Sequence, residues 1–264
     1  MNDHEHIEPT IKVGWFIGIL LAMGVGGWFL AQWNLLLTWG IIFALMAAFL
    51  ICAGYNRTRR VAGCLIDARN RMSLSRFQLI CWTLLVLSAF ITAVLYNIQV
   101  NLSGQAMLVA IPEALWVVMW ISTTSLIGSP LLLKTTKDEL AKDKLPPGTS
   151  EKDAKVLRPG AASCNDCMTE ARWSELLQGE TNANDRVLDI ARVQMFYFTW
   201  IALLMYTYLL VDTFVKAGST AEAYGIDSLP PVSGGLIALL GISHTAYLAK
   251  KRINEPASKP KVES

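Results

Sequence analysis

Six long apolar runs dominate the pattern of hydrophobic and polar positions along this chain. They cover residues 13–30, 35–54, 79–100, 114–133, 193–215 and 232–249. Each holds about 18 to 23 residues, which as α-helix spans roughly 27 to 35 Å, enough for a hydrocarbon core of about 30 Å. The runs are continuous rather than alternating, and lipid demands a backbone whose hydrogen bonds are satisfied internally. The pattern predicts an all-α polytopic membrane protein with six transmembrane helices.

The polar segments between the runs predict the orientation. All of the 23 lysines and arginines except Lys216 fall in segments 1–12, 55–78, 134–192 and 250–264. Basic residues are retained on the cytoplasmic side, so we expect these segments, and both termini, in the cytoplasm. Trp28, Trp33 and Trp39 surround the opposite turn at 31–34, where an aromatic belt is expected. Charged residues make up only 17% of the chain, against about 25% in soluble domains.

Two parts of the chain resemble each other. Arg76, Gln78 and Thr83 have the same spacing as Arg192, Gln194 and Thr199, at the start of the third and fifth runs. A proline stands before the fourth and the sixth run, at 112 and 230. We interpret 79–133 and 193–249 as parallel repeated hairpins, related by an axis along the membrane normal and preceded by an N-terminal hairpin at 13–54. Chance similarity between two apolar sequences is the alternative.

The segment 134–192 divides into two parts. Residues 134–160 alternate in charge around Pro146, Pro147 and Gly148, which is typical of a linker. Residues 163–179 begin with Ser163 and Asp166 in a capping arrangement and end in Gly179, which predicts a short amphipathic helix. Its apolar side would contact the bundle, the lipid or a partner protein.

Hydroxyl groups gather in the fourth and sixth runs. A polar pathway along these runs would be lined by Ser122, Thr123, Ser125, Ser129, Ser243, His244 and Thr245. The alternative is that the hydroxyls bond back to their own helices and join them to neighbours. His244 is the one ionisable residue well inside a run. Such a group is a functional candidate by default, or else a hydrogen-bonded packing residue.

Small residues recur at every fourth position of the first run, at Gly14, Gly18, Ala22 and Gly26. This spacing gives one nearly flat helix face, which lets another backbone approach closely in lipid. We expect this face to pack against a helix, either of the same chain or of a second copy in a homo-oligomer.

Two further pairs of residues are candidates for binding. Arg76 and Arg192 precede their runs, where they would anchor the helix at the interface or bind an anionic headgroup or cytoplasmic ligand. Cys164 and Cys167 have the spacing of half a zinc site. A complete zinc site needs four ligands. No second pair follows, so we expect no cofactor.

These observations favour one function and leave an alternative open. The favoured function is an oligomeric channel or pore for ions or small solutes, lined by the fourth and sixth runs. The alternative is a non-conducting anchor, scaffold or sensor that engages a cytoplasmic protein through residues 134–192. No catalytic motif points to an enzyme. The small net charge of +2 gives no argument for nucleic acid as a partner.

The compact loops favour a bacterial inner membrane. Asn101 and Ser103 would form an outward-facing glycosylation site in a eukaryote, so the cell type stays open.

Overall fold

Helices account for all of the regular secondary structure in the ranges that the structure describes. The computed structural model describes residues 13–100, 108–132, 162–219 and 225–253, where β-pairing is limited to isolated bridges. The predicted all-α class is confirmed for these ranges.

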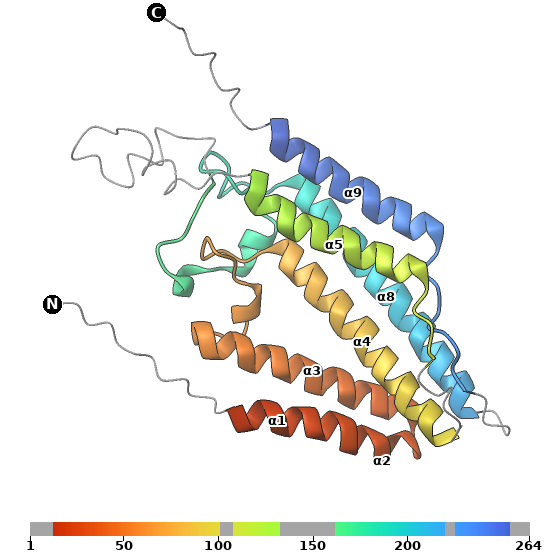
Figure 1. Cartoon of the computed structure of the whole chain (residues 1–264). Helices are drawn as coiled ribbons and strands as arrows, with labels where there is room; N and C mark the ends of the chain where they lie inside the picture. Colours follow the sequence, from red (N-terminus) through yellow and green to blue (C-terminus); the bar gives the residue numbers. More distant parts are fainter. Residues whose placement is uncertain (1–12, 101–107, 133–161, 220–224, 254–264) are drawn as a thin grey trace, which may run out of the picture. The chain divides into compact units, whose positions relative to one another are not determined.

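Every one of the six apolar runs is helical (Figure 1). The first run consists of α1 (Val13–Leu21), a π-helical turn at Ala22–Gly26, and α2 (Gly27–Ala31). The others are α3 (Leu35–Thr58), α4 (Leu74–Val100), α5 (Glu113–Leu132), α8 (Ile190–Ser219) and α9 (Gly234–Ile253). Short 3-10 turns occur at Gly63–Leu65, Met168–Glu170 and Trp173–Leu176.

Four helices of the described ranges are long and apolar enough to cross a membrane. They are Gly14–Ala31, Leu35–Thr58, Leu74–Val100 and Ile190–Ser219, while the apolar part of α9, Gly234–Thr245, is shorter. Large apolar side chains on these helices face outward, among them Trp15, Leu20, Phe29, Trp200, Leu204 and Tyr208. A soluble bundle would bury such residues, whereas lipid solvates them, so this surface suits a membrane-embedded protein.

The chain forms two compact units. The first contains Met1–Leu65, Ile80–Val117 and Ala202–Ser233, and the second contains Ile66–Leu79, Val118–Ile201 and Gly234–Ser264. The helices α4, α5 and α8 therefore each contribute one part to each unit.

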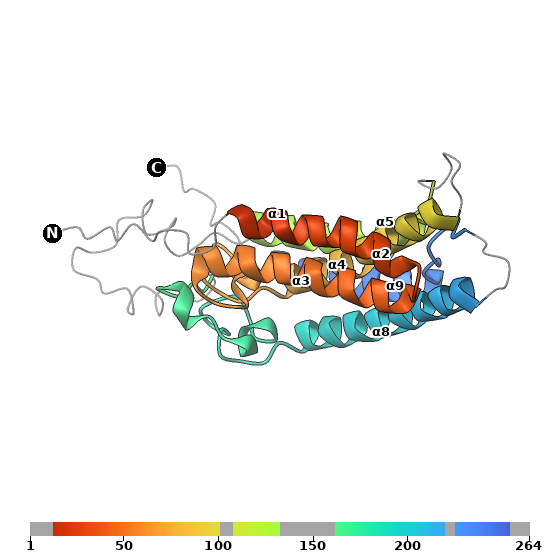
Figure 2. The ribbon, with the colours of Figure 1, turned by 90° about the horizontal axis from the view of Figure 1, so that it is seen from below.

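In the first unit, α1 and α2 lie beside α3 (Figures 1 and 2). The rings of Phe16 and Phe49 meet edge to face, with centroids 5.0 Å apart. Closer packing occurs at Gly27, where an added Cβ would lie 2.8 Å from Cδ1 of Leu95 and 3.2 Å from Cδ1 of Ile42. A side chain at this position would require Leu95 to shift, so glycine allows this helix to lie close to α3 and α4.

Polar side chains also join segments of the first unit. Trp39 Nε1 donates to Ser88 Oγ at 3.0 Å, which links α3 to α4. Near the other end of α4, Asn97 donates from Nδ2 to the Ile226 carbonyl at 2.9 Å and accepts from the Ile226 N–H at 2.7 Å. Asn97 thus satisfies both main-chain groups of Ile226, as buried polar groups require.

In the second unit, the N-terminal parts of α4 and α8 meet through a buried hydrogen bond. Gln78 Nε2 donates to Thr199 Oγ1 at 2.6 Å, and both residues are almost completely buried. The helices α5 and α9 also approach in this unit, because a Cβ added at Gly241 would lie 3.9 Å from Cδ1 of Ile121.

Two helices begin earlier than their apolar runs. α4 begins at Leu74 rather than residue 79, and α8 begins at Ile190 rather than residue 193. The Ser73 hydroxyl and the Asp189 carboxylate each accept a bond from a main-chain N–H of the first turn, at 3.4 and 3.0 Å. These caps allow each helix to start within polar sequence.

The structure differs from the short helix expected over residues 163–179. Two 3-10 turns, at Met168–Glu170 and Trp173–Leu176, take its place. Ser163 does not cap a helix, because its hydroxyl donates to Asp185 Oδ2 at 3.0 Å.

Candidate functional site

A folded cap of the second unit is built from residues 66–73 and 162–189. These two segments are far apart in the sequence and lie side by side, the first orange and the second green to teal in Figure 1. Four arginines and three carboxylates lie in the cap and in the first turns of α4 and α8, and we call them the arginine cluster. Its members are Arg69, Arg71, Arg76, Arg192, Asp67, Glu175 and Glu180.

The first cap segment is a tight turn organised by Asp67. Its Oδ1 accepts from the N–H groups of Arg69 and Arg71, at 2.8 and 3.2 Å, and its Oδ2 accepts from Arg69 Nε at 2.9 Å. Asn70 adopts the left-handed conformation with φ of 58°, which asparagine tolerates in turns. This turn directs both arginines toward the second cap segment.

Two asparagines join the cap segments reciprocally. Asn70 Nδ2 donates to the Asn165 carbonyl at 3.1 Å, and Asn165 Nδ2 donates to the Asn70 carbonyl at 2.9 Å. The Asn165 N–H also donates to the Arg69 carbonyl at 3.0 Å. These bonds fix the register between the two segments.

Glu175 is the centre of the arginine cluster. This buried carboxylate accepts from the Met72 and Arg172 N–H groups at 2.9 and 3.2 Å and from Asn165 Nδ2 at 2.8 Å. Arg71 Nε lies 3.8 Å from it. One side chain therefore joins the two cap segments and neutralises a buried cation.

A second carboxylate links the cap to α8. Glu180 Oε1 lies 3.3 Å from Arg69 Nη2 and 3.5 Å from Arg192 Nη1. Arg192 is 2% exposed and donates from Nη1 to the Gln178 carbonyl at 2.7 Å. The first turn of α8 is thereby tied to the second cap segment.

Arg76 does the same for α4. Its Nη1 donates to the Ile66 carbonyl at 2.9 Å, at the start of the first cap segment. Both arginines expected at the interface thus bind cap carbonyls inside the chain. Binding of an anionic headgroup or cytoplasmic ligand by them stays a prediction.

Burial sets the electrostatics of the cluster. Loss of solvation lowers the pKa of the Arg71 guanidinium, and Glu175 opposes that effect. Arg69 and Arg192 lower the pKa of Arg71 further. Removing one member of such a buried network leaves an uncompensated charge, which is costly.

Four hydroxyl groups of α5 and α9 bond to carbonyls of their own helices. Ser122 donates to the Val118 carbonyl at 3.2 Å and Thr123 to the Met119 carbonyl at 2.9 Å. Ser243 and Thr245 donate to carbonyls of α9 at 3.2 and 2.8 Å. The side chains of Ser125 and Ser129 lie outside the described residues.

His244 is buried in the second unit, beside the equally buried Ser243. This placement agrees with a packing residue as well as with a functional one. A pathway lined by His244 and the hydroxyls stays a prediction.

The flat face of the first helix is open. A Cβ added at Gly14, Gly18 or Gly26 would meet nothing within 4 Å among the described residues, and Ala22 is exposed. Together with Leu45, this face borders a shallow groove. Packing of these small residues against a second copy therefore stays a prediction.

The two cysteines of the cap are not arranged as a metal centre. Cys164 Sγ donates to the Ala162 carbonyl at 3.8 Å, and the exposed Cys167 Sγ lies 2.9 Å from Thr169 Oγ1. Within the described ranges, no group of three or more His, Cys, Asp or Glu could hold a metal ion.

The arginine cluster was missed from the sequence, although a signal for it exists. The loop at 57–76 contains six arginines and a single acid, Asp67, whereas residues 163–192 contain six acids and three arginines. Opposite charge on two loops predicts that they pair. Residues 163–179 were assigned to a short helix, and pairing of its carboxylates with the arginines of residues 57–76 was not predicted.

The fold and this site define a helical protein whose apolar helices are compatible with a membrane and whose α4 and α8 carry a folded polar cap. Comparison of the chain with protein-family models, with curated proteins and with solved structures finds no match in any of the three.

Proposed function

We propose that this protein is a non-conducting membrane module, an anchor, scaffold or sensor, whose cap engages a cytoplasmic protein partner. The observation that carries the proposal is the cap itself, in which Glu175 and Glu180 neutralise buried arginines and hold separate segments together. A solvated linker would not need this buried network.

The surface of the cap supports a protein partner. Trp173 is 57% exposed, and Val187 and Leu188 are exposed on the second cap segment. Exposed tryptophan next to arginine, here Arg172, is the composition typical of binding hot spots. The inward-bonded hydroxyls Ser122 and Ser243 weigh against a water-filled pathway.

We further propose that the chain crosses the membrane six times, with both termini and the cap in the cytoplasm. The distribution of lysine and arginine supports this orientation. A bacterial inner membrane remains the proposed location.

Hydrogen bonds support the repeat arrangement. Ala110 and Ser228 each stand two residues before the proline of their hairpin, and they pair with each other in parallel. An axis along the membrane normal would produce such a parallel pair. Gln78 and Thr199, which belong to the two copies of the repeated motif, also bond to each other.

Site-specific photo-crosslinking in cells tests the partner. A photoreactive residue at position 173 should crosslink to one defined protein, whereas one at the exposed Glu170 of the same cap should not. Equal crosslinking from both positions would contradict a specific surface at Trp173.

An oligomeric channel is the second candidate, favoured by the open face at Gly14, Gly18 and Ala22. Ion flux into sealed liposomes that changes with Ser122→Ala and His244→Ala would support the channel and overturn the non-conducting module. Replacing Gly18 and Ala22 by leucine should abolish assembly if this face is the interface. Gly24→Leu, off this face, is the matched control.

A further inference from the structure

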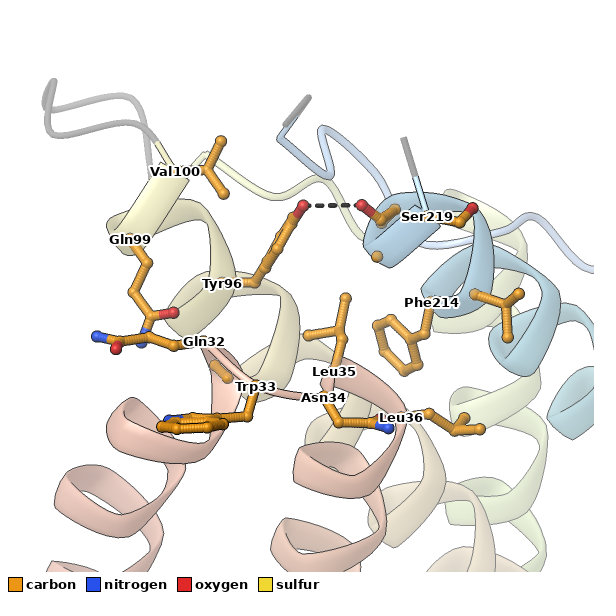
Figure 3. A pocket seen from close by; sticks show the side chains of 14 residues that line it. Gln32, Trp33, Asn34, Leu35, Leu36, Tyr96, Gln99, Val100, Phe214 and Ser219 are labelled. Carbon is orange, nitrogen blue, oxygen red and sulfur yellow. Dashed lines mark hydrogen bonds between the residues drawn. The ribbon is translucent and has the colours of Figure 1, made fainter. Parts of the chain in front are cut away.

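A cavity of about 730 Å³ lies at one end of the first unit. Its walls come from the turn between α2 and α3 and from the last turns of α4 and α8 (Figure 3). We call it the terminal pocket. Its size falls in the range of small-molecule sites, about 300 to 1,000 Å³.

Helix ends bring polar main-chain groups to the terminal pocket without a charged side chain, because three helices end there and α3 begins there at Leu35. α2 ends at Ala31, α4 at Val100 and α8 at Ser219, and all three residues line the pocket. The last carbonyls of a helix lack helical partners and carry partial negative charge. Tyr96 shows their use, because its hydroxyl donates to the Ala217 carbonyl at 2.8 Å.

The described lining of the terminal pocket favours a neutral ligand over a charged one. None of the described residues that line it is Lys, Arg, Asp or Glu. Lys216, which precedes Ala217, is held by Asp212 at 2.6 Å. A charged ligand would therefore find no counter-charged side chain among the described lining residues, where helix C-termini and the N-terminus of α3 both contribute partial charges.

The side chains of the pocket offer donors and acceptors together with one flat apolar surface. The amides of Gln32 and Gln99 lie on the same side of the pocket as Trp33 in Figure 3. Gln99 Nε2 also donates to the Trp28 carbonyl. Asn34 accepts the Leu37 N–H through Oδ1 at 2.9 Å, which keeps its Nδ2 as a donor. The indole of Trp33 is 87% exposed, so one ring face is open to a ligand.

We propose that the terminal pocket binds a neutral, hydroxyl-rich head group such as a sugar. Hydroxyl groups both donate and accept, so they match amide side chains and the helix-end carbonyls. The apolar C–H face of a sugar ring would lie against Trp33, whose ring supplies a large amphipathic surface. The head group comes either from a glycolipid or from a free saccharide, and this site is independent of the partner proposed for the cap.

Lipid retention tests the terminal pocket. The full chain, purified in a detergent without a sugar, is placed in phosphatidylcholine nanodiscs with equal fractions of monoglucosyl-diacylglycerol, diacylglycerol and phosphatidylglycerol. Native mass spectrometry then counts the lipids that remain bound. We expect the glucosyl lipid to be retained at least five-fold over the other two. Equal retention of the three, or preference for the anionic lipid, would overturn the proposal.

Variants locate the binding. Trp33→Ala and Gln32→Ala change exposed lining residues and should reduce retention of the glucosyl lipid at least five-fold, with helix content unchanged. Leu37→Ala, also exposed but outside the lining, is the matched control and should retain it. Retention unchanged in Trp33→Ala and Gln32→Ala would overturn the assignment to this pocket.

Competition distinguishes the sources of the head group. Free methyl glucoside that displaces the glucosyl lipid would support recognition of the sugar alone. Lipid retained against a large excess of methyl glucoside would support a glycolipid that also needs its acyl chains.

Discussion

Among single residues, Glu175 is the centre of the interactions that hold the cap together. We expect Glu175→Gln to open the cap locally, because Arg71 would remain buried without its counter-charge. Breaking a buried ion pair from one side costs about 3 kcal/mol or more. Hydrogen exchange at the Met72 amide, which bonds to Glu175, should accelerate by about two orders of magnitude.

Glu170→Gln is the matched control for Glu175. This carboxylate is exposed in the same cap segment and accepts one bond, from the Asp166 N–H at 3.2 Å. We expect exchange in the cap to change by less than about five-fold, as surface substitutions rarely exceed 0.5–1 kcal/mol. Equal acceleration in the two variants would mean that Glu175 is not the centre of the cluster.

The bond between Gln78 and Thr199 predicts a measurable coupling between α4 and α8. Thr199→Val removes the acceptor and leaves the buried Gln78 amide without it, at a cost of about 1–2 kcal/mol. Adding Gln78→Leu should recover part of this loss, so the two changes should not be additive. The free energy of unfolding in detergent micelles, measured for the two single variants and the double variant, gives this coupling.

Thr213→Val serves as the control for this cycle, since Thr213 bonds only to the Leu209 carbonyl of its own helix in the described structure. Its effect should be small and independent of Gln78. Full additivity of Thr199→Val and Gln78→Leu would contradict the coupling.

Sequence reasoning at the residue scale found Arg76 and Arg192 but not their use. Their positions beside apolar runs identified them as interface residues, which needs only local sequence. Their hydrogen bonds to the Ile66 and Gln178 carbonyls depend on how two distant segments fold together. The spacing of residues within one segment does not predict such contacts.

At the scale of elements, the helix α3 ends in a close approach of two backbones. A Cβ added at Gly54 would lie 2.5 Å from the Cys64 nitrogen and 3.1 Å from the Gly63 carbonyl carbon. Backbone atoms cannot move aside as a flexible side chain would. Gly54→Ala should therefore destabilise the protein by about 1–3 kcal/mol in thermal or denaturant unfolding.

Gly40 provides the control within the same helix. A Cβ there would meet nothing within 4 Å among the described residues, and alanine favours helix over glycine by up to about 1 kcal/mol. Gly40→Ala should thus be neutral or stabilising. A loss of stability equal to that of Gly54→Ala would show that general helix effects, not backbone contact, explain both.

Long apolar runs predicted helices well, because a run of this length can satisfy its backbone in lipid only as a helix. In contrast, the prediction of a short helix over 163–179 was wrong. Glu175 accepts N–H groups from two segments, and those bonds accompany the 3-10 turn at Trp173–Leu176. Tertiary contacts decide short polar elements, so local capping signals are weak evidence for them.

At the scale of the whole molecule, charge and hydropathy support one central proposal, in which the cap of a membrane-spanning protein lies in the cytoplasm and the α2–α3 turn lies outside. Four helices of the described ranges have the length and hydropathy to span. The distribution of lysine and arginine predicts the orientation of these helices in the membrane. Neither property depends on the arrangement of the two units.

Labelling of single cysteines from the two faces of a sealed membrane tests this claim most directly. One variant keeps the exposed Cys167 of the cap with the other four cysteines replaced by alanine, and a second carries only Gln32→Cys in the α2–α3 turn. A membrane-impermeant maleimide should label Gln32→Cys in right-side-out vesicles and Cys167 only in inverted ones. Labelling of both positions from the same face would contradict the account.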